Sequence, residues 1–261
     1  MSTFLKPLLL AATLALGLSA CNKDTATTAP AAGTTKASAV AAGATPTESA
    51  VDPQIAAQAQ AAAKVVMEQA ATGPAPVEGT DYVVIKDGSP WQPLTNGETA
   101  EIAEVFAYWC PHCAEFQPLV DAWKPMLPKT VRFVGLPMSG GNNDTMASVF
   151  FAAEMTNQIP QIHNRMFKAI HQDRVLKPNA SRDEVLSFLA GQGIDAKAFA
   201  GAMDSFAMKG RLNQAVQFAR RSEVEGTPTL IVNGKYRVLG KTQEDMLRIA
   251  TALAAKDNAA Q

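Results

Sequence analysis

The chain has no excess of charge of either sign, because 23 Lys and Arg residues face 24 Asp and Glu residues and leave a formal net charge of -1 over 261 residues. Nucleic-acid-binding domains usually carry a basic face, so the composition gives no support to a nucleic-acid partner. A long apolar segment is also lacking. The most apolar run, from Leu8 to about Ala20, is too short to span a bilayer and is typical of a secretory leader.

The leader ends in Leu18-Ser19-Ala20-Cys21. Small residues before a cysteine at the end of an apolar run resemble the lipobox of bacterial lipoproteins, in which the leader is removed and the new N-terminal cysteine is acylated. We therefore expect residues 1–20 to be a lipoprotein signal peptide and Cys21 to be the lipidation site. Ordinary cleavage after Ala20 is the alternative, and it would leave Cys21 as an odd free thiol. Export places the protein in an oxidising compartment.

The next segment, residues 21–51, consists almost entirely of Ala, Thr, Gly, Pro and Ser. Such a segment cannot bury enough apolar surface to offset the entropy of ordering it, so we expect a disordered tether. Residues 52–72 differ, because Asp52 can cap a helix and Pro53 suits its first position. We expect one helix there and a folded domain over residues 80–255.

The expected domain contains both strands and helices. Short runs rich in β-branched and aromatic residues predict strands at 82–85, 102–108, 131–137, 229–232 and 235–240. Asn233-Gly234 between the last two is a strong signal for a two-residue hairpin. Residues from about 140 to 222 have helical periodicity throughout, and a closing helix is expected over about 243–255. This order of elements predicts an α/β fold.

Cysteine is scarce, and two of the three cysteines lie in one short stretch, FAYWCPHCAEF. There Cys110 and Cys113 flank Pro111 and His112. A Cys-x-x-Cys pair can bind zinc, attach haem, form a static disulfide or exchange disulfides with other proteins.

The metal and haem interpretations lack the residues that they need. Structural zinc takes four ligands, and outside the motif the chain offers only His163 and His171, which we expect to be satisfied core or helix-surface residues. A c-type haem site needs histidine directly after the second cysteine, where this chain has Ala114. A static disulfide across two residues closes a tiny loop and stabilises little. We expect no metal, and no cofactor beyond a redox-active Cys110–Cys113 disulfide.

The position of the motif favours disulfide exchange, because it follows a predicted strand and opens a predicted helix. Pro111 suits the first helical position, so Cys110 would lie at the helix N-terminus, where unpaired amides and the helix dipole stabilise a thiolate. Cys113 would face the core one turn later, attack the mixed disulfide and release the partner. His112 would place a donor or partial positive charge beside Cys110. A protein stabilised in its reduced form gives its disulfide away.

Two further positions have open interpretations at this point. Glu104 lies six residues before Cys110 in an apolar strand. It is either an outward-facing strand residue or a carboxyl near Cys113 whose raised pKa lets it relay the proton of that thiol. Pro228 directly precedes a predicted strand, where an ordinary trans proline is common. Spacing alone decides neither question.

Several of these features together resemble one family. They are Glu104, the aromatic-rich strand, Cys110-Pro111-His112-Cys113, Phe116, and Gly226-Thr227-Pro228 followed by VNGKY. Over roughly residues 80–255 they are similar to the DsbA-type thiol:disulfide oxidoreductases. The resemblance implies a thioredoxin fold, of the α/β class, with an inserted helical domain over about 140–222.

The resemblance also implies roles and partners. Glu104 would be the buried carboxyl beneath Cys113. Pro228 would follow a cis peptide bond, and Thr227 would lie opposite the cysteines in an edge that binds substrate polypeptides by strand-like hydrogen bonds. Reduced exported proteins in the periplasm would be the substrates, and a DsbB-like, quinone-linked membrane protein would be the reoxidant.

Three functions are compatible with the sequence. The first is an enzyme that donates its disulfide to exported proteins while anchored to a cell-envelope membrane through Cys21. The second is a disulfide isomerase or reductase, although isomerases of this superfamily generally carry an N-terminal dimerisation domain and residues 52–72 are short for one. The third is a lipoprotein that binds clients through the groove of a thioredoxin fold without catalysing exchange.

Overall fold

The computed structural model of the chain describes residues 52–95, 97–141 and 144–259. The predicted signal peptide, the predicted lipidation site Cys21 and the predicted tether of residues 21–51 lie outside these ranges. No helix within them combines the length and the hydropathy that a bilayer crossing requires.

A five-stranded mixed sheet forms the centre of the described domain, and its strand order is β1-β5-β4-β2-β3. The strands are β1 (Tyr82–Val84), β2 (Ala100–Phe106), β3 (Val131–Pro137), β4 (Thr229–Val232) and β5 (Tyr236–Val238). β2 is parallel to β3, and the other neighbouring pairs are antiparallel. β2 ends two residues before its predicted end, because the chain turns there toward the cysteine motif.

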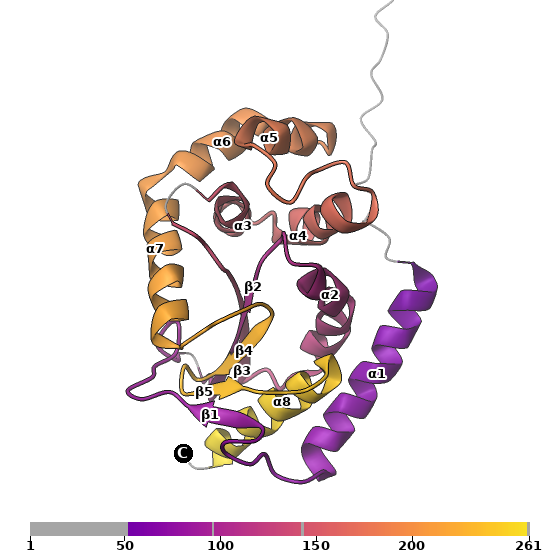
Figure 1. Cartoon of the computed structure of the whole chain (residues 1–261), viewed down its shortest axis with the longest axis vertical. Helices are drawn as coiled ribbons and strands as arrows, with labels where there is room; N and C mark the ends of the chain where they lie inside the picture. Colours follow the sequence, from indigo (N-terminus) through magenta and orange to yellow (C-terminus); the bar gives the residue numbers. More distant parts are fainter. Residues whose placement is uncertain (1–51, 96, 142–143, 260–261) are drawn as a thin grey trace, which may run out of the picture. The chain divides into compact units, whose positions relative to one another are not determined.

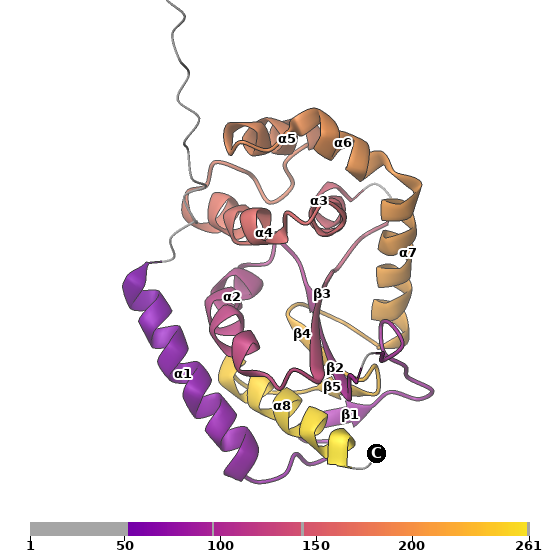
Figure 2. The same cartoon turned by 180° about the vertical axis from the view of Figure 1, so that it is seen from behind.

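Helices cover both faces of this sheet (Figures 1 and 2). On one face lie α1 (Pro53–Thr72), α2 (Pro111–Trp123) and α8 (Gln243–Ala259), and their apolar side chains share one core with the sheet. A 3-10 turn, η1 (Lys124–Met126), follows α2. α1 begins where Asp52 caps it by accepting a hydrogen bond from the backbone N of Gln54 at 2.8 Å. It then lies along α2 and α8.

A second group of helices is inserted between β3 and β4. These are α3 (Thr145–Met155), α4 (Ile159–Phe167), the π-helix η2 (Lys168–Gln172), α5 (Arg182–Gly191), α6 (Ala196–Asp204) and α7 (Phe206–Arg221). Their apolar side chains form a core of their own, to which Phe106, Tyr108 and both motif cysteines contribute. The start of α2 therefore packs with the inserted helices, whereas Phe116 and the residues after it pack on the sheet.

The inserted region departs from the predicted helical pattern over residues 173–181, which form no helix. Arg174 adopts a positive φ of 54°, which lies outside the helical region. Pro178 has no N–H to donate to a helical hydrogen bond. The resulting loop runs from η2 to α5, whose first turn has the reciprocal hydrogen bonds of a capping box between Ser181 and Glu184.

β2 positions the site, and all of its residues are buried. Alternate residues of a strand point to opposite faces of the sheet. Ile102 belongs to the core beneath α2 and α8, whereas Ala103 packs with Phe218 of α7 on the other face. By the same alternation Glu104 points to the α2 face and Glu101 points away from it.

The β4–β5 turn has the predicted hairpin geometry. Asn233 and Gly234 have φ values of 53° and 63°, as a two-residue turn of this kind requires. Gly234 is also needed for space, because a Cβ there would lie 1.7 Å from the backbone oxygen of Ser89.

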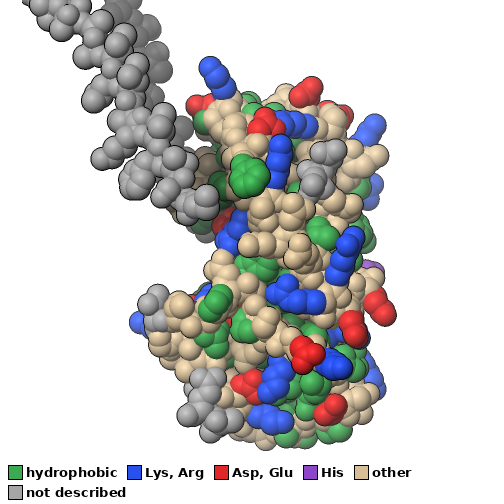
Figure 3. Space-filling model, turned by 90° about the vertical axis from the view of Figure 1, so that its left-hand side faces the viewer, with side chains coloured by type: hydrophobic (Ala, Val, Ile, Leu, Met, Phe, Trp, Pro, Cys, Tyr) green, Lys and Arg blue, Asp and Glu red, His purple; other side chains and the backbone are tan. Residues whose placement is uncertain are grey.

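Charged side chains are interspersed by sign on the face that carries α7 (Figure 3). This arrangement agrees with the balanced composition of the chain.

Candidate active site

The two motif cysteines lie at the junction between β2 and α2. Cys110 is the residue that precedes α2, with extended backbone angles, and Pro111 occupies the first helical position. Cys113 lies one turn further along and faces the core. Both cysteines are buried and carry free thiols in this structure.

The loop before β4 brings Thr227 and Pro228 to the cysteines. The thiol of Cys110 donates a hydrogen bond to the backbone oxygen of Thr227, with a sulfur–oxygen distance of 3.2 Å. The peptide bond between Thr227 and Pro228 is cis. The structure thus brings together two segments that are 117 residues apart in the sequence.

Burial raises the pKa of the Cys113 thiol well above its ordinary value. The backbone of Ala107 and the hydroxyl of Thr227 partly counter this rise, whereas the charges of Cys110 and Glu104 add to it. Cys113 therefore holds a proton firmly, and any reaction that uses its sulfur must move that proton.

Glu104 is buried on the α2 face of β2, and its Oε1 has no hydrogen-bond partner among the described residues. Burial raises the pKa of this carboxyl from 4.5 to about 8, and the charge of Asp121 adds to the rise while that of Lys124 opposes it. The carboxyl borders a cavity of about 370 Å³ together with Gly135, its partner on β3. At neutral pH Glu104 can both hold and release a proton.

His112 lies in the first turn of α2, two residues after Cys110. Its side chain is 74% exposed, and its Nδ1 lies 3.5 Å from the Glu115 carboxylate. Helical geometry accounts for this arrangement, because residues three apart share a face of a helix and His112 and Glu115 are so spaced in the first turns of α2. The backbone oxygen of His112 accepts a hydrogen bond from Gln243 of α8 at 3.5 Å.

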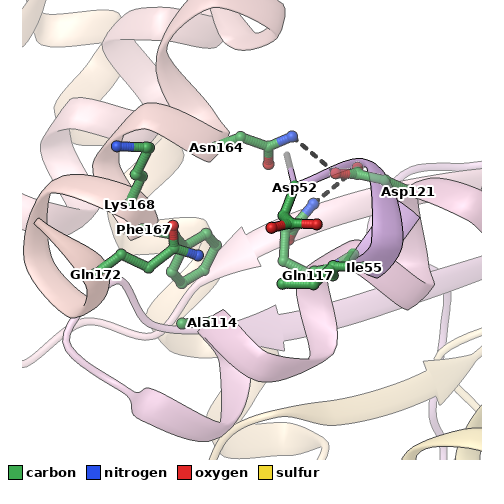
Figure 4. Close-up of a pocket in the computed structure, with 10 residues that line it drawn as sticks. Asp52, Ile55, Ala114, Gln117, Asp121, Asn164, Phe167, Lys168 and Gln172 are labelled. Atoms are coloured by element: carbon green, nitrogen blue, oxygen red, sulfur yellow. Dashed lines mark hydrogen bonds between the residues drawn. The ribbon is translucent and has the colours of Figure 1, made fainter. Parts of the chain in front are cut away.

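A chain of hydrogen bonds that sequence reasoning missed joins α2 to the inserted helices. The Tyr108 hydroxyl lies 2.9 Å from Nδ1 of His163, and Nε2 of His163 lies 3.0 Å from Oε1 of Gln117. Burial lowers the pKa of His163 to about 3, so its ring is neutral and bridges these two groups. Gln117 and Asn164 then both donate to Asp121 (Figure 4).

The local sequence carries little signal for this network. The hydrogen bonds from His163 reach residues 55 and 46 positions away. A polar Gln117 beside Phe116 on the buried side of an apolar helix is the one local indication.

A cysteine at a helix N-terminus, a second buried cysteine one turn later, and a cis proline beside them on a mixed sheet define a class of protein. They are the features of a redox-active thioredoxin fold, here with helices inserted between β3 and β4.

Comparisons with known proteins identify the family within this class. A family model described as a DSBA-like thioredoxin domain matches residues 126–252. The chain is 37% identical over 186 residues to the thiol:disulfide interchange protein DsbA of Pseudomonas aeruginosa, which covers 70% of this chain and 86% of that protein. It is 36% identical to DsbA of Azotobacter vinelandii over 65% of this chain and 80% of the relative.

A solved structure agrees with these sequence matches. The oxidoreductase DsbA from Xylella fastidiosa superposes with a TM-score of 0.67 at 37% identity, and the match covers 71% of this chain and all of that one. The chain belongs to the DsbA family and is a thiol:disulfide oxidoreductase. The predicted thioredoxin fold with inserted helices is confirmed.

Proposed function

We propose that the chain donates its Cys110–Cys113 disulfide to reduced exported proteins in the bacterial cell envelope. The observation that carries this proposal is the asymmetry between the two sulfurs. Cys110 lies at the N-terminus of α2 against Thr227, and Cys113 lies buried behind it with a raised pKa. The family acts through a redox-active disulfide of its own, so no further cofactor is invoked.

In the donating direction, a substrate thiolate attacks Sγ of Cys110 and breaks the Cys110–Cys113 bond. The electron pair leaves on the sulfur of Cys113, which takes a proton because its pKa is raised by burial. We assign Glu104 as the donor of this proton, because its pKa of about 8 keeps it largely protonated at neutral pH.

A second substrate thiolate then attacks the substrate sulfur of the mixed disulfide. A new disulfide forms in the substrate, and Cys110 leaves as a thiolate stabilised by the unpaired amides at the start of α2. This stabilisation acts on the reduced protein and is absent from the disulfide, so it favours giving the disulfide away. We assign His112 a supporting role, because protonation would add positive charge to this exposed end of the helix.

Thr227 and Pro228 would form the edge on which the substrate polypeptide lies. The backbone oxygen of Thr227 faces Cys110, where it can accept a hydrogen bond from an extended chain once the cysteine has reacted. The absence of an N–H on Pro228 leaves this edge open to a partner instead of pairing it within the sheet.

The direction of electron flow can be tested by the reduction potential against glutathione. We expect a potential above that of thioredoxin, together with alkylation of Cys110 at mildly acidic pH. A potential near that of thioredoxin, with alkylation only at alkaline pH, would favour the reductase alternative.

Replacing both cysteines by serine tests the third function, client binding without catalysis, because pure client binding would survive that change and oxidation would not.

We further propose a location and a reoxidant. The DsbA relatives and the leader support a periplasmic protein, the lipobox-like stretch supports a lipid anchor at Cys21, and a DsbB-like membrane protein linked to quinone would restore the disulfide. Metabolic labelling with a palmitate analogue tests the anchor. The anchor at Cys21 would be refuted if the wild type took up no label. It would also be refuted if the Cys21→Ala variant were still labelled.

A further inference from the structure

A groove runs along α2, and neither Thr227 nor Pro228 lines it. It consists of two adjoining hollows of about 270 and 740 Å³, which share Ile55 of α1, Ala114 and Pro118 of α2, and Gln172 of η2. Figure 4 shows the inner hollow, with Asp52 on one side and Lys168 and Gln172 on the other. We call the two hollows together the α1–η2 groove.

The outer hollow of the α1–η2 groove reaches the residue that follows Cys110. Its outer hollow is lined by Pro111, which directly follows Cys110, and by Glu115 in the next turn of α2. A polypeptide joined to Cys110 by a mixed disulfide therefore has this hollow within reach of its neighbouring residues. The groove is a different surface from the edge at Thr227 and Pro228.

Exposed apolar side chains gather around the same end of α2. Eight large apolar residues are exposed among the described residues, and three of them border the groove or the motif: Trp109 at 44%, Ile55 at 43% and Val175 at 64%. Trp109 precedes Cys110, and Val175 lies between two residues that line the outer hollow. Apolar surface within a polar rim is typical of a protein interaction site.

The rim of the outer hollow is positively charged on the η2 side. Arg174 and Lys177 are exposed there, and neither forms a salt bridge in the part of the chain that the structure describes. Lys168 is different, because Asp173 holds its ammonium group. Lys177 also acts on Glu184 of α5, and Glu115 is the one acidic residue among the described residues that line the outer hollow, so a positive excess remains on the η2 side. This excess beside exposed apolar surface favours an occupant with apolar and acidic side chains.

We propose that the α1–η2 groove binds a flank of the substrate polypeptide that carries apolar and acidic residues next to its reacting cysteine. The groove thereby sets which dithiols react fastest. This inference rests on the proposed function and adds to it a substrate preference.

The test uses the full chain in its disulfide form and four two-cysteine peptides. The peptides differ only in carrying Leu-Asp-Asp or Leu-Lys-Lys, placed before or after the first cysteine. The readout is the second-order rate constant of peptide oxidation, followed by acid quenching and mass spectrometry. In one of the two placements we expect the acidic peptide to react about three- to tenfold faster than the basic one.

Charge reversal on the rim assigns this preference to the groove. Arg174→Glu combined with Lys177→Glu should reverse it, whereas the matched control, Lys197→Glu combined with Lys209→Glu on exposed positions of α6 and α7, should keep it. Equal rates for acidic and basic peptides in both placements would overturn the inference. A reversal of equal size in the control would also overturn it, because it would show an effect of net charge alone.

Oxidation of dithiothreitol separates this inference from the proposed function. Dithiothreitol is too small to fill the groove, so wild type and the Lys197→Glu, Lys209→Glu control should oxidise it at the same rate. A wild type that fails to oxidise dithiothreitol would refute the proposed function itself.

Substitutions in α1, which forms the apolar wall of the groove, give an independent test. Ile55→Ala should slow oxidation of the favoured peptide about threefold. Val65→Ala on an exposed position of the same helix should not, because Val65 does not line the groove. Equal effects of the two changes would exclude α1 from the binding surface.

Discussion

Two buried glutamates on β2 differ in the hydrogen bonds that their carboxyl groups form. Glu101 is fully hydrogen-bonded: Oε1 accepts from the backbone N of Trp91 at 2.6 Å, and Oε2 accepts from Nε and Nη2 of Arg132 at 3.1 and 2.7 Å. Glu104, three residues later on the other face, has an Oε1 without a partner among the described residues. Its pKa is raised to about 8.

The difference shows which buried carboxyl is available for chemistry. A buried ion pair with all its hydrogen bonds made fixes local structure. A buried carboxyl without a charge partner is neutral at most pH values and exchanges its proton near neutrality. Glu101 therefore ties β2 to β3, and Glu104 is the carboxyl that we propose as the proton carrier for Cys113.

The largest expected effect on stability is at Glu101. Glu101→Gln would leave the half-buried guanidinium of Arg132 without its main charge partner, and we expect a loss of about 3–5 kcal/mol in the free energy of unfolding. Urea unfolding measures this loss. The matched control is Glu98→Gln, since Glu98 also pairs with Arg132 but is more exposed, and it should cost about 1 kcal/mol or less. A larger loss for Glu98→Gln than for Glu101→Gln would contradict the comparison.

Glu104→Gln should raise the free energy of unfolding, in contrast to Glu101→Gln, and the gain should depend on pH. The folded-state pKa of about 8 lies above the unfolded value of 4.5. The stability that the protonated carboxyl contributes is thus present below pH 4.5 and is lost as pH rises toward 8, at about 1.4 kcal/mol per pH unit. At pH 7 we expect the reduced variant to be more stable than the reduced wild type by about 3 kcal/mol.

Urea unfolding at several pH values checks this second prediction. The stability difference should vanish at about pH 4 and grow with pH, because glutamine has no proton to lose. Parallel pH profiles for wild type and variant would show that Glu104 titrates normally, and the contrast with Glu101 would then fail.

The smallest expected effects come from the two charges near Glu104. Asp121→Asn should lower the pKa of Glu104, and Lys124→Met should raise it, since Asp121 raises and Lys124 lowers that pKa in the native protein. Each shift should be less than about one pH unit. Urea unfolding at several pH values gives the pH at which the loss in the free energy of unfolding levels off, and this pH reports the pKa of Glu104. Shifts in the same direction for both variants would contradict the assigned electrostatics.

Much of this site could be predicted from sequence because its signals are local. A strand that runs into Cys-Pro-His-Cys places the first cysteine at a helix N-terminus, and Asn233-Gly234 marks the hairpin. The spacing of Glu104 from Cys110 does not decide whether its side chain faces outward or toward Cys113. Its burial follows from the pairing of β2 with two strands and from α2 packing above it, which are tertiary facts.

Other features had no local signal. Strand alternation predicts one buried face, and β2 is buried on both, so the pairing of Glu101 with Arg132 could not be foreseen. The neutral His163 bridge depends on partners from distant segments. The outward position of His112 depends on which face of α2 packs on the sheet.

The central claim is that Glu104 accepts the proton of Cys113 when that thiol attacks a mixed disulfide on Cys110. The direct measurement is the lifetime of a mixed disulfide between Cys110 and a peptide with one cysteine, followed by acid-quenched mass spectrometry from pH 6 to pH 9. Attack by Cys113 re-forms the Cys110–Cys113 disulfide and releases the peptide thiol. We predict that the wild-type rate rises up to about pH 8 and then levels off. Glu104→Gln should be at least about tenfold slower at pH 8 and lack this inflection, while the folded Glu101→Gln variant should behave as wild type. Equal lifetimes and equal pH profiles for wild type and Glu104→Gln would contradict the claim.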